Sequence, residues 1–233
     1  MNAIRALLTA CFLLVSTPAA ADTVATYKAQ QGGQMTIEVS SNGNMRTSMG
    51  TSGTYSLTVD GEDYLVFYTD KGAVVARWAD LGTVMRDHMK KVMPDMLDMP
   101  DSADPSPFKY IPGGQMTVGG RAGQVWYQQF GDALERAPKF VMSVDPDLAE
   151  LGRAFVRQAE SSMKLASIAF GDRNPMDGML DVLKTGAPLL INGMALGAVS
   201  HAPIAAERFA LPAKPETLEQ VRERFEANGG HLP

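Results

Sequence analysis

Thioether sulfur is unusually abundant in this 233-residue chain, which carries 15 methionines. Thioethers and imidazole bind monovalent copper well, so a run that combines them could form a copper site. The run contains Met85, His88, Met89, Met93, Met96 and Met99. At helical spacing, however, Met85, Met89 and Met93 share one face, which favours an apolar helix face packed on a sheet or lining a cavity. We favour that second interpretation and predict no metal and no other cofactor.

Other patterns that could support catalysis or metal binding are weak. The histidines His88, His201 and His231 lack the spacing of a metal site, and no Gly-x-Ser-x-Gly elbow occurs. Four aspartates, Asp95, Asp98, Asp101 and Asp104, could surround a calcium ion, but Pro100 and Pro105 interrupt them. A solvated acidic loop is the better interpretation. The sequence therefore predicts a protein that is not an enzyme.

The first 21 residues have the pattern of a secretory signal peptide. Arg5 precedes an apolar run over residues 6–15, and small residues end at Ala21. The run is shorter than the roughly 20 residues that span a bilayer. A lipoprotein cleavage box at Cys11 is the alternative, but the apolar run continues past that cysteine. We expect cleavage after Ala21 and one periplasmic domain over residues 22–233, with no transmembrane segment.

Charge and cysteine content limit the classes of partner and of stabilising bond. The chain has a net charge of −5 and no cluster of lysine and arginine in its sequence, which makes nucleic acid a poor partner. Cys11 is the single cysteine, so removal of the leader would leave neither a disulfide nor a thiolate site. The predicted domain must therefore be stabilised by an ordinary apolar core.

Strands joined by tight turns are expected in the first third of the domain. Alternation and turn pairs such as Asn42-Gly43 and Asp60-Gly61 predict a meander. Its strands are expected at residues 23–29, 35–41, 44–49, 55–59, 64–69 and 73–78. A helix capped by Asp80 then carries the methionine face, and the loop over residues 100–107 could act as a movable cover.

The remainder of the domain is expected to alternate strands with packing helices. Strands are predicted at residues 115–118, 124–131, 139–144, 188–192 and 195–200, with an edge strand at 208–211. A long helix should follow the Asp145 cap and Pro146, with a short helix at 176–184 and a polar terminal helix at 217–227.

Several motifs give the chain a resemblance to a known superfamily. They are Tyr27 in the first strand, Asn44-Met45-Arg46, the hairpin over residues 60–64, Gly119-Gly120 before residues 125–130, and Gly186-Ala187-Pro188-Leu189. In these motifs the chain resembles the periplasmic lipoprotein carriers (LolA/LolB-like) and related uncharacterised families. That resemblance implies an incomplete antiparallel barrel covered by helices, with a hollow for acyl chains. It also implies that Arg46 occupies the place of an arginine that helps to close the carrier.

The sequence therefore predicts an α+β fold, a strongly curved antiparallel sheet or half-barrel with helices packed on its concave face. The expected function is non-catalytic binding of an apolar ligand, a lipid or a lipoprotein. A structural or interaction domain without a small ligand is the alternative, and a copper-handling protein is the third. The predicted ligand-binding residues are Arg46, Tyr64, Phe67, Trp78, Met85, Met89, Met93 and Trp126.

Overall fold

The computed structural model describes residues 22–50, 53–92, 108–170 and 178–231. Over these residues the chain forms one antiparallel sheet of 12 strands together with helices, which confirms the α+β class. The strands are β1 (Thr23–Ala29), β2 (Gln34–Val39), β3 (Met45–Met49), β4 (Tyr55–Val59), β5 (Glu62–Thr69), β6 (Gly72–Arg77), β7 (Phe108–Val118), β8 (Arg121–Phe130), β9 (Ala133–Leu134), β10 (Phe140–Ser143), β11 (Ala187–Ile191) and β12 (Met194–Ser200). The α-helices are α1 (Trp78–Val92), α3 (Ala149–Phe170), α4 (Met179–Leu183) and α5 (Leu218–Ala227), and the 3-10 helices are η1 (Pro146–Leu148) and η2 (Ala206–Phe209).

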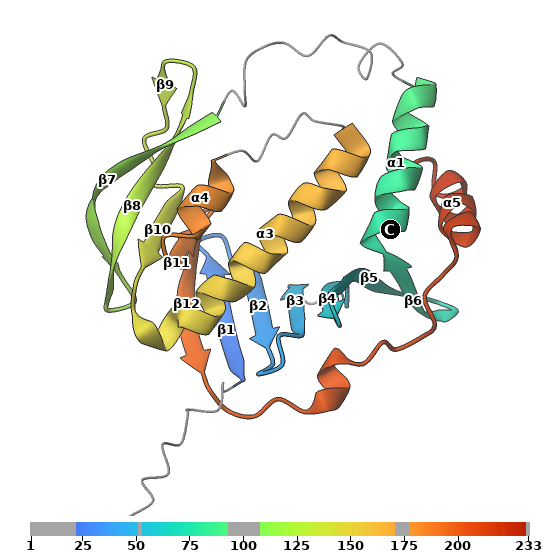
Figure 1. Cartoon of the computed structure of the whole chain (residues 1–233), viewed down its shortest axis with the longest axis horizontal. Helices are drawn as coiled ribbons and strands as arrows, with labels where there is room; N and C mark the ends of the chain where they lie inside the picture. The colour runs from blue at the N-terminus through green and yellow to red at the C-terminus, as the bar shows by residue number, and fades with distance from the viewer. Residues whose placement is uncertain (1–21, 51–52, 93–107, 171–177, 232–233) are drawn as a thin grey trace, which may run out of the picture.

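The sheet has the strand order β6-β5-β4-β3-β2-β1-β12-β11-β10-β8-β7, and β9 pairs with β8 (Figure 1). Strands β6 and β7 end this order and do not pair with each other, so the described sheet is open. The predicted signal peptide and the predicted loop over residues 100–107 lie outside the described residues.

Tight turns set the register of the first six strands, as predicted. Gly43 and Gly61 adopt φ values of 91° and 81°, and Asp60 also has a positive φ of 52°. Such angles suit glycine and, less often, aspartate or asparagine, which explains why these pairs turn the chain. Strand β7 was predicted too short, because Pro112 and Gly113-Gly114 break the alternation, and the structure accommodates them in an irregular register against β8.

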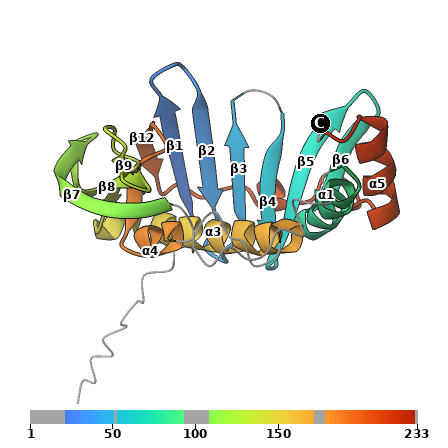
Figure 2. The same cartoon turned by 90° about the horizontal axis from the view of Figure 1, so that it is seen from above.

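Helices pack on one face of this sheet. Helix α3 contacts β1, β2 and β11, whereas α1 contacts β5 and β6, and α5 packs on α1. Figure 2 shows α3 and α4 along the same side of the strands. Helix α1 begins at Trp78 and not at the predicted cap Asp80, which instead lies 3.7 Å from Arg77 as an ion pair across its first turn.

A segment over residues 201–216, here called the strap, covers part of the opposite face. Phe209 in η2 packs with Tyr55, Leu57, Tyr64, Val66 and Val75, so the predicted edge strand at 208–211 is wrong. The Asp22 carboxylate accepts hydrogen bonds of 2.7 Å from the backbone N–H groups of Ile204 and Ser41. These bonds lower the pKa of Asp22 and hold the start of β1 to the strap.

Candidate functional site

The predicted ligand-binding residues lie on both faces of the sheet. Phe67 packs beneath α1 and α5, whereas Tyr64 packs beneath the strap on the other face. Successive side chains of a strand point to opposite faces, so two residues three positions apart in β5 cannot line the same cavity. Both side chains are buried within apolar clusters.

Arg46 also lies on the strap side of the sheet. Its guanidinium carbon lies 3.6 Å from the centroid of the Tyr55 ring, and its Nε atom lies 3.6 Å from a carboxylate oxygen of Glu38. Arg208 from the strap donates two hydrogen bonds, of 2.9 and 2.6 Å, to the same carboxylate. This geometry gives Arg46 a role in anchoring the strap, on the face away from the helices.

The methionine face was predicted to point inward, and Met85 does pack against the apolar cluster formed by α1, α5, β5 and β6. Trp78 joins the same cluster, and Met89 is half-buried. His88 makes an edge contact with Phe225 at 5.3 Å between ring centroids. Met93 lies outside the described residues. Within the described ranges no group of three or more His, Cys, Asp or Glu side chains is placed to hold a metal.

Trp126 is placed in β8, far along the sheet from the cluster that holds Trp78 and Phe67. It is half-buried and packs against the core cluster around Phe140 and Tyr27. Its indole Nε1 is buried and has no hydrogen-bond partner among the described residues. The structure therefore does not bring the predicted residues together into one site.

The layer between α3 and the central strands is filled. Tyr27, Ile37, Leu151 and Leu189 have no exposed surface, and the Tyr27 and Phe155 rings meet edge to face at 5.6 Å. The Tyr27 hydroxyl donates a 2.6 Å hydrogen bond to the Pro188 carbonyl, and burial raises the pKa of that hydroxyl. A polar gap of about 50 Å³ lies farther along, with Ser56, Asp63 and Gln158 among its lining residues.

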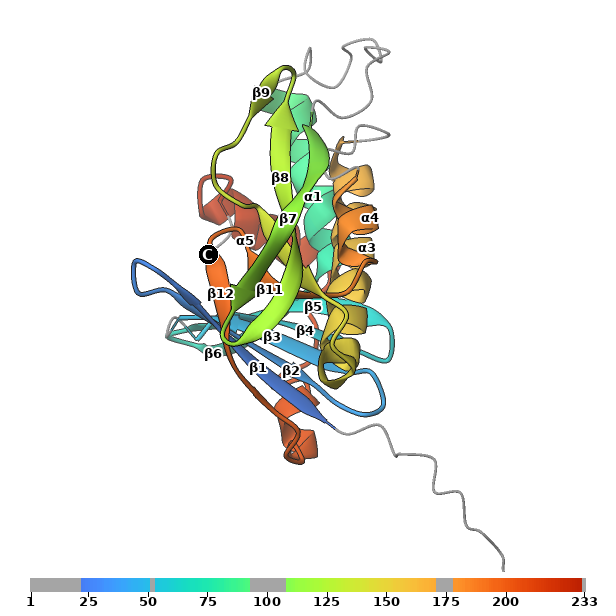
Figure 3. The same cartoon turned by 90° about the vertical axis from the view of Figure 1, so that its left-hand side faces the viewer.

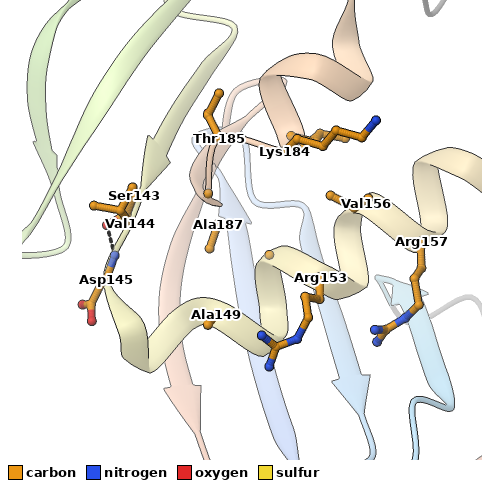
Figure 4. A pocket seen from close by; sticks show the side chains of 13 residues that line it. Ser143, Val144, Asp145, Ala149, Arg153, Val156, Arg157, Lys184, Thr185 and Ala187 are labelled. Carbon is orange, nitrogen blue, oxygen red and sulfur yellow. Dashed lines mark hydrogen bonds between the residues drawn. The ribbon is translucent and has the colours of Figure 1, made fainter.

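A larger hollow, of about 520 Å³, lies beside α3 near the ends of β10 and β11 (Figure 4). This volume is within the range of about 300–1,000 Å³ typical of small-molecule sites. Three segments line the hollow. They are Ser143, Val144 and Asp145 after β10; Ala149, Gly152, Arg153, Val156 and Arg157 on α3; and Leu183, Lys184, Thr185, Gly186 and Ala187 between α4 and β11.

Glycine allows these three segments to meet. A Cβ added at Gly186 would lie 2.2 Å from the Ser143 carbonyl oxygen, and one added at Gly152 would lie 3.1 Å from the Gly186 carbonyl oxygen. The backbones of α3, β10 and the α4–β11 loop therefore approach more closely than any larger residue would permit.

The lining of the hollow combines apolar side chains with three cations, which extend from two sides of α3. Val144 is 87% exposed, a large fraction for a valine, and Val156 is half-buried, whereas Leu183 lines the hollow but belongs to the core and is only 2% exposed. Glu150 accepts hydrogen bonds from Arg153, at 2.6 Å, and from Arg157, at 3.3 Å, and Arg121 pairs with Asp145. In Figure 4 Lys184 extends above α3, and the two arginines extend from the other side of the helix.

The hollow was not predicted from the sequence. In the sequence, Lys184 lies far from Arg153 and Arg157, and no motif includes all three residues. One local signal did exist: Arg153 and Arg157 share a helix face with Gly152 and Val156, which places small, apolar and cationic side chains together. That pattern predicts a surface that is neither core nor simply solvated.

No helix in the described part of the chain has the length and apolar character needed to cross a membrane. No protein-family model matches the chain, and comparison with curated proteins and with solved structures gives no match either. The resemblance to lipoprotein carriers therefore rests on the sequence motifs alone.

Proposed function

We propose that this protein is a non-catalytic binding protein for an apolar ligand, a lipid or an acylated chain, which occupies the hollow beside α3. The observation that carries the proposal is an open volume of about 520 Å³ with Val144, Val156 and Leu183 in its wall. Covering exposed apolar surface with a ligand stabilises the complex by about 25 cal/mol for each Å² removed from water.

The proposal includes a half-barrel with its helices on the concave side, in an exported protein. It is supported by the contacts of α3 with β1, β2 and β11 and of α1 with β5 and β6, at two separated parts of one sheet. The signal-peptide pattern over residues 1–21 supports export to the periplasm. Because the layer between α3 and the middle of the sheet is filled, we place the expected ligand at the hollow beside the first turns of α3.

Titration with a fluorescent fatty-acid analogue tests the proposal. Ala149 is exposed and lines the hollow, so Ala149→Trp should fill it with little change in stability. We expect saturable binding to the unmodified chain and at least about tenfold weaker binding to this variant, since a tenfold loss needs only about 1.4 kcal/mol.

Ala79→Trp provides the matched control. Ala79 is also exposed and also lies in the first turn of a helix, but on α1. If both tryptophan variants weaken binding equally, the ligand does not occupy the hollow beside α3. If the unmodified chain shows no saturable binding, the proposed function is wrong.

An interaction domain is the second candidate, and it is favoured by the arm formed by β7, β8 and β9. Phe130 and Leu134 on this arm are 59% and 52% exposed, and β7 is an end strand of the sheet (Figure 3). Exposed apolar side chains near the end of a sheet are common at protein interfaces. Sedimentation of the unmodified chain and of the double variant Phe130→Ser/Leu134→Ser separates the two functions. A concentration-dependent dimer lost in the variant would support an interaction role, and a monomer at every concentration would oppose self-association through the arm.

A further inference from the structure

We infer that the ligand of the hollow carries an anionic head group, for which the carboxylate of a fatty acid is the probe. This inference rests on the proposed function and specifies its ligand. It is drawn from the charges at the edge of the hollow, which differ in sign from the charge of the whole chain.

The ionised side chains that line the hollow are three cations, Arg153, Arg157 and Lys184, and one anion, Asp145, which gives a net charge of +2. Their ion-pair partners, Arg121 and Glu150, add one charge of each sign and leave the sum unchanged. The chain as a whole has a net charge of −5. A local excess of positive charge on an acidic protein attracts an anion to this place.

The cations lie on two sides of α3, with Lys184 above the helix and Arg153 and Arg157 extending from its other side, so Lys184 is the cation that a head group beside the α4–β11 loop would meet. The arginines share one carboxylate, Glu150, and so retain donor groups that a second carboxylate could use. Lys184 forms no ion pair with a described residue, and its ammonium extends from the α4–β11 loop beside the hollow (Figure 4). A carboxylate beside Lys184 would leave the alkyl chain against Val144 and Val156.

The charges beside the hollow favour an anionic amphiphile over a neutral or a cationic one. A neutral amphiphile would fill the same apolar volume but gain nothing from the cations, and a cationic amphiphile would be repelled by them. A carboxylic acid with an ordinary pKa of about 4.3 is ionised at neutral pH, so dodecanoate is a suitable probe.

The experiment compares three probes with the same alkyl chain, each below its micellar concentration: dodecanoate, dodecan-1-ol and dodecyltrimethylammonium. Binding to the full chain is measured by displacement of the fluorescent analogue at low and high salt. We expect dodecanoate to bind about tenfold more tightly than the alcohol at low salt, with a smaller ratio at high salt, because such exposed charges contribute modestly and are screened. The cationic probe should bind most weakly.

Two charge reversals then test the edge itself. Lys184→Glu should weaken dodecanoate binding about tenfold and leave the affinity for the alcohol unchanged. Lys184→Gln should have a dodecanoate affinity between those of the unmodified chain and Lys184→Glu. Lys71→Glu makes the same charge change in the exposed turn between β5 and β6, and it should change neither the dodecanoate affinity nor the alcohol affinity. Equal binding of dodecanoate and the alcohol would overturn the anionic head group while leaving the proposed function in place. Binding of none of the probes would overturn both.

Discussion

Two neighbouring faces of α3 show how one helix can both complete a core and border a hollow. The first face carries Leu151, Ala154 and Phe155, which are buried against the central strands. The second face, one residue farther round, carries Gly152, Arg153 and Val156, which line the hollow. The first face directs apolar side chains at the sheet, whereas the Arg153 side chain of the second face is 61% exposed.

The difference shows that the filled layer needs large apolar side chains from both the helix and the sheet. Tyr27 and Leu189 reach from the sheet toward the first face, whereas the second faces Gly186 and Ala187. Interiors pack closely when side chains from both layers interdigitate, and only the first face meets such partners.

Adjacent truncations on α3 should differ greatly in their effect on stability. Phe155→Ala should lower the free energy of unfolding by about 3–5 kcal/mol, because it leaves a cavity beneath the helix and removes the contact with Tyr27. Val156→Ala should lower it by about 1 kcal/mol or less, since that side chain is half-buried at the hollow. Urea denaturation measures both, and similar losses would show that the two faces are packed alike.

Adding one methyl group where the backbones meet should be costly. Gly186→Ala would place a carbon 2.2 Å from the Ser143 carbonyl oxygen, so β10 and the α4–β11 loop must separate. We expect a loss of about 1–3 kcal/mol in the free energy of unfolding. Gly114→Ala is the control, because a Cβ there has no neighbour within 4 Å and should change stability by less than about 0.5 kcal/mol. Equal stability of the two variants would argue against the close approach.

Removing one negative charge beside the hollow should strengthen binding of the carboxylate probe. Glu150→Gln frees the guanidinium groups of Arg153 and Arg157 from their shared partner and should tighten dodecanoate binding by about two- to fivefold. Glu160→Gln, an exposed position on the same helix, should have no effect. An unchanged affinity in Glu150→Gln would mean that the arginines do not contact the head group.

Much of the fold could be predicted from the sequence because its first half is built from local signals. Asn42-Gly43 and Asp60-Gly61 mark turns whose positive φ values the structure shows, and the strands between them alternate cleanly. The strap could not be predicted in this way. Phe209 and Leu211 alternate as they would in a strand, but their packing on the far face of β4 and β5 depends on contacts distant in sequence.

The candidate site was less predictable, for two physical reasons. Large aromatic residues are often predicted to line a cavity, but Tyr64 and Phe67 are core residues on opposite faces of β5. Residues three positions apart in a strand point to opposite faces, so their spacing already indicated this. The hollow, in contrast, is lined by three segments that are distant in sequence. Gly152 and Gly186 bring these segments together, and a glycine in a sequence does not indicate which backbone it will approach.

The pairing of β1 with β12 has a consequence for how the chain acquires its structure. Val24 pairs with Ser200, so the first and last strands of the sheet are neighbours at its middle. Strands β1 to β6 can pair while the chain is being synthesised, but the edge of β1 that pairs with β12 has no partner until β12 has been synthesised. Contacts so far apart in sequence form slowly, and an exposed central edge favours aggregation while it lasts. A chain cut before β12 should therefore aggregate through β1 and would not be a smaller version of this fold.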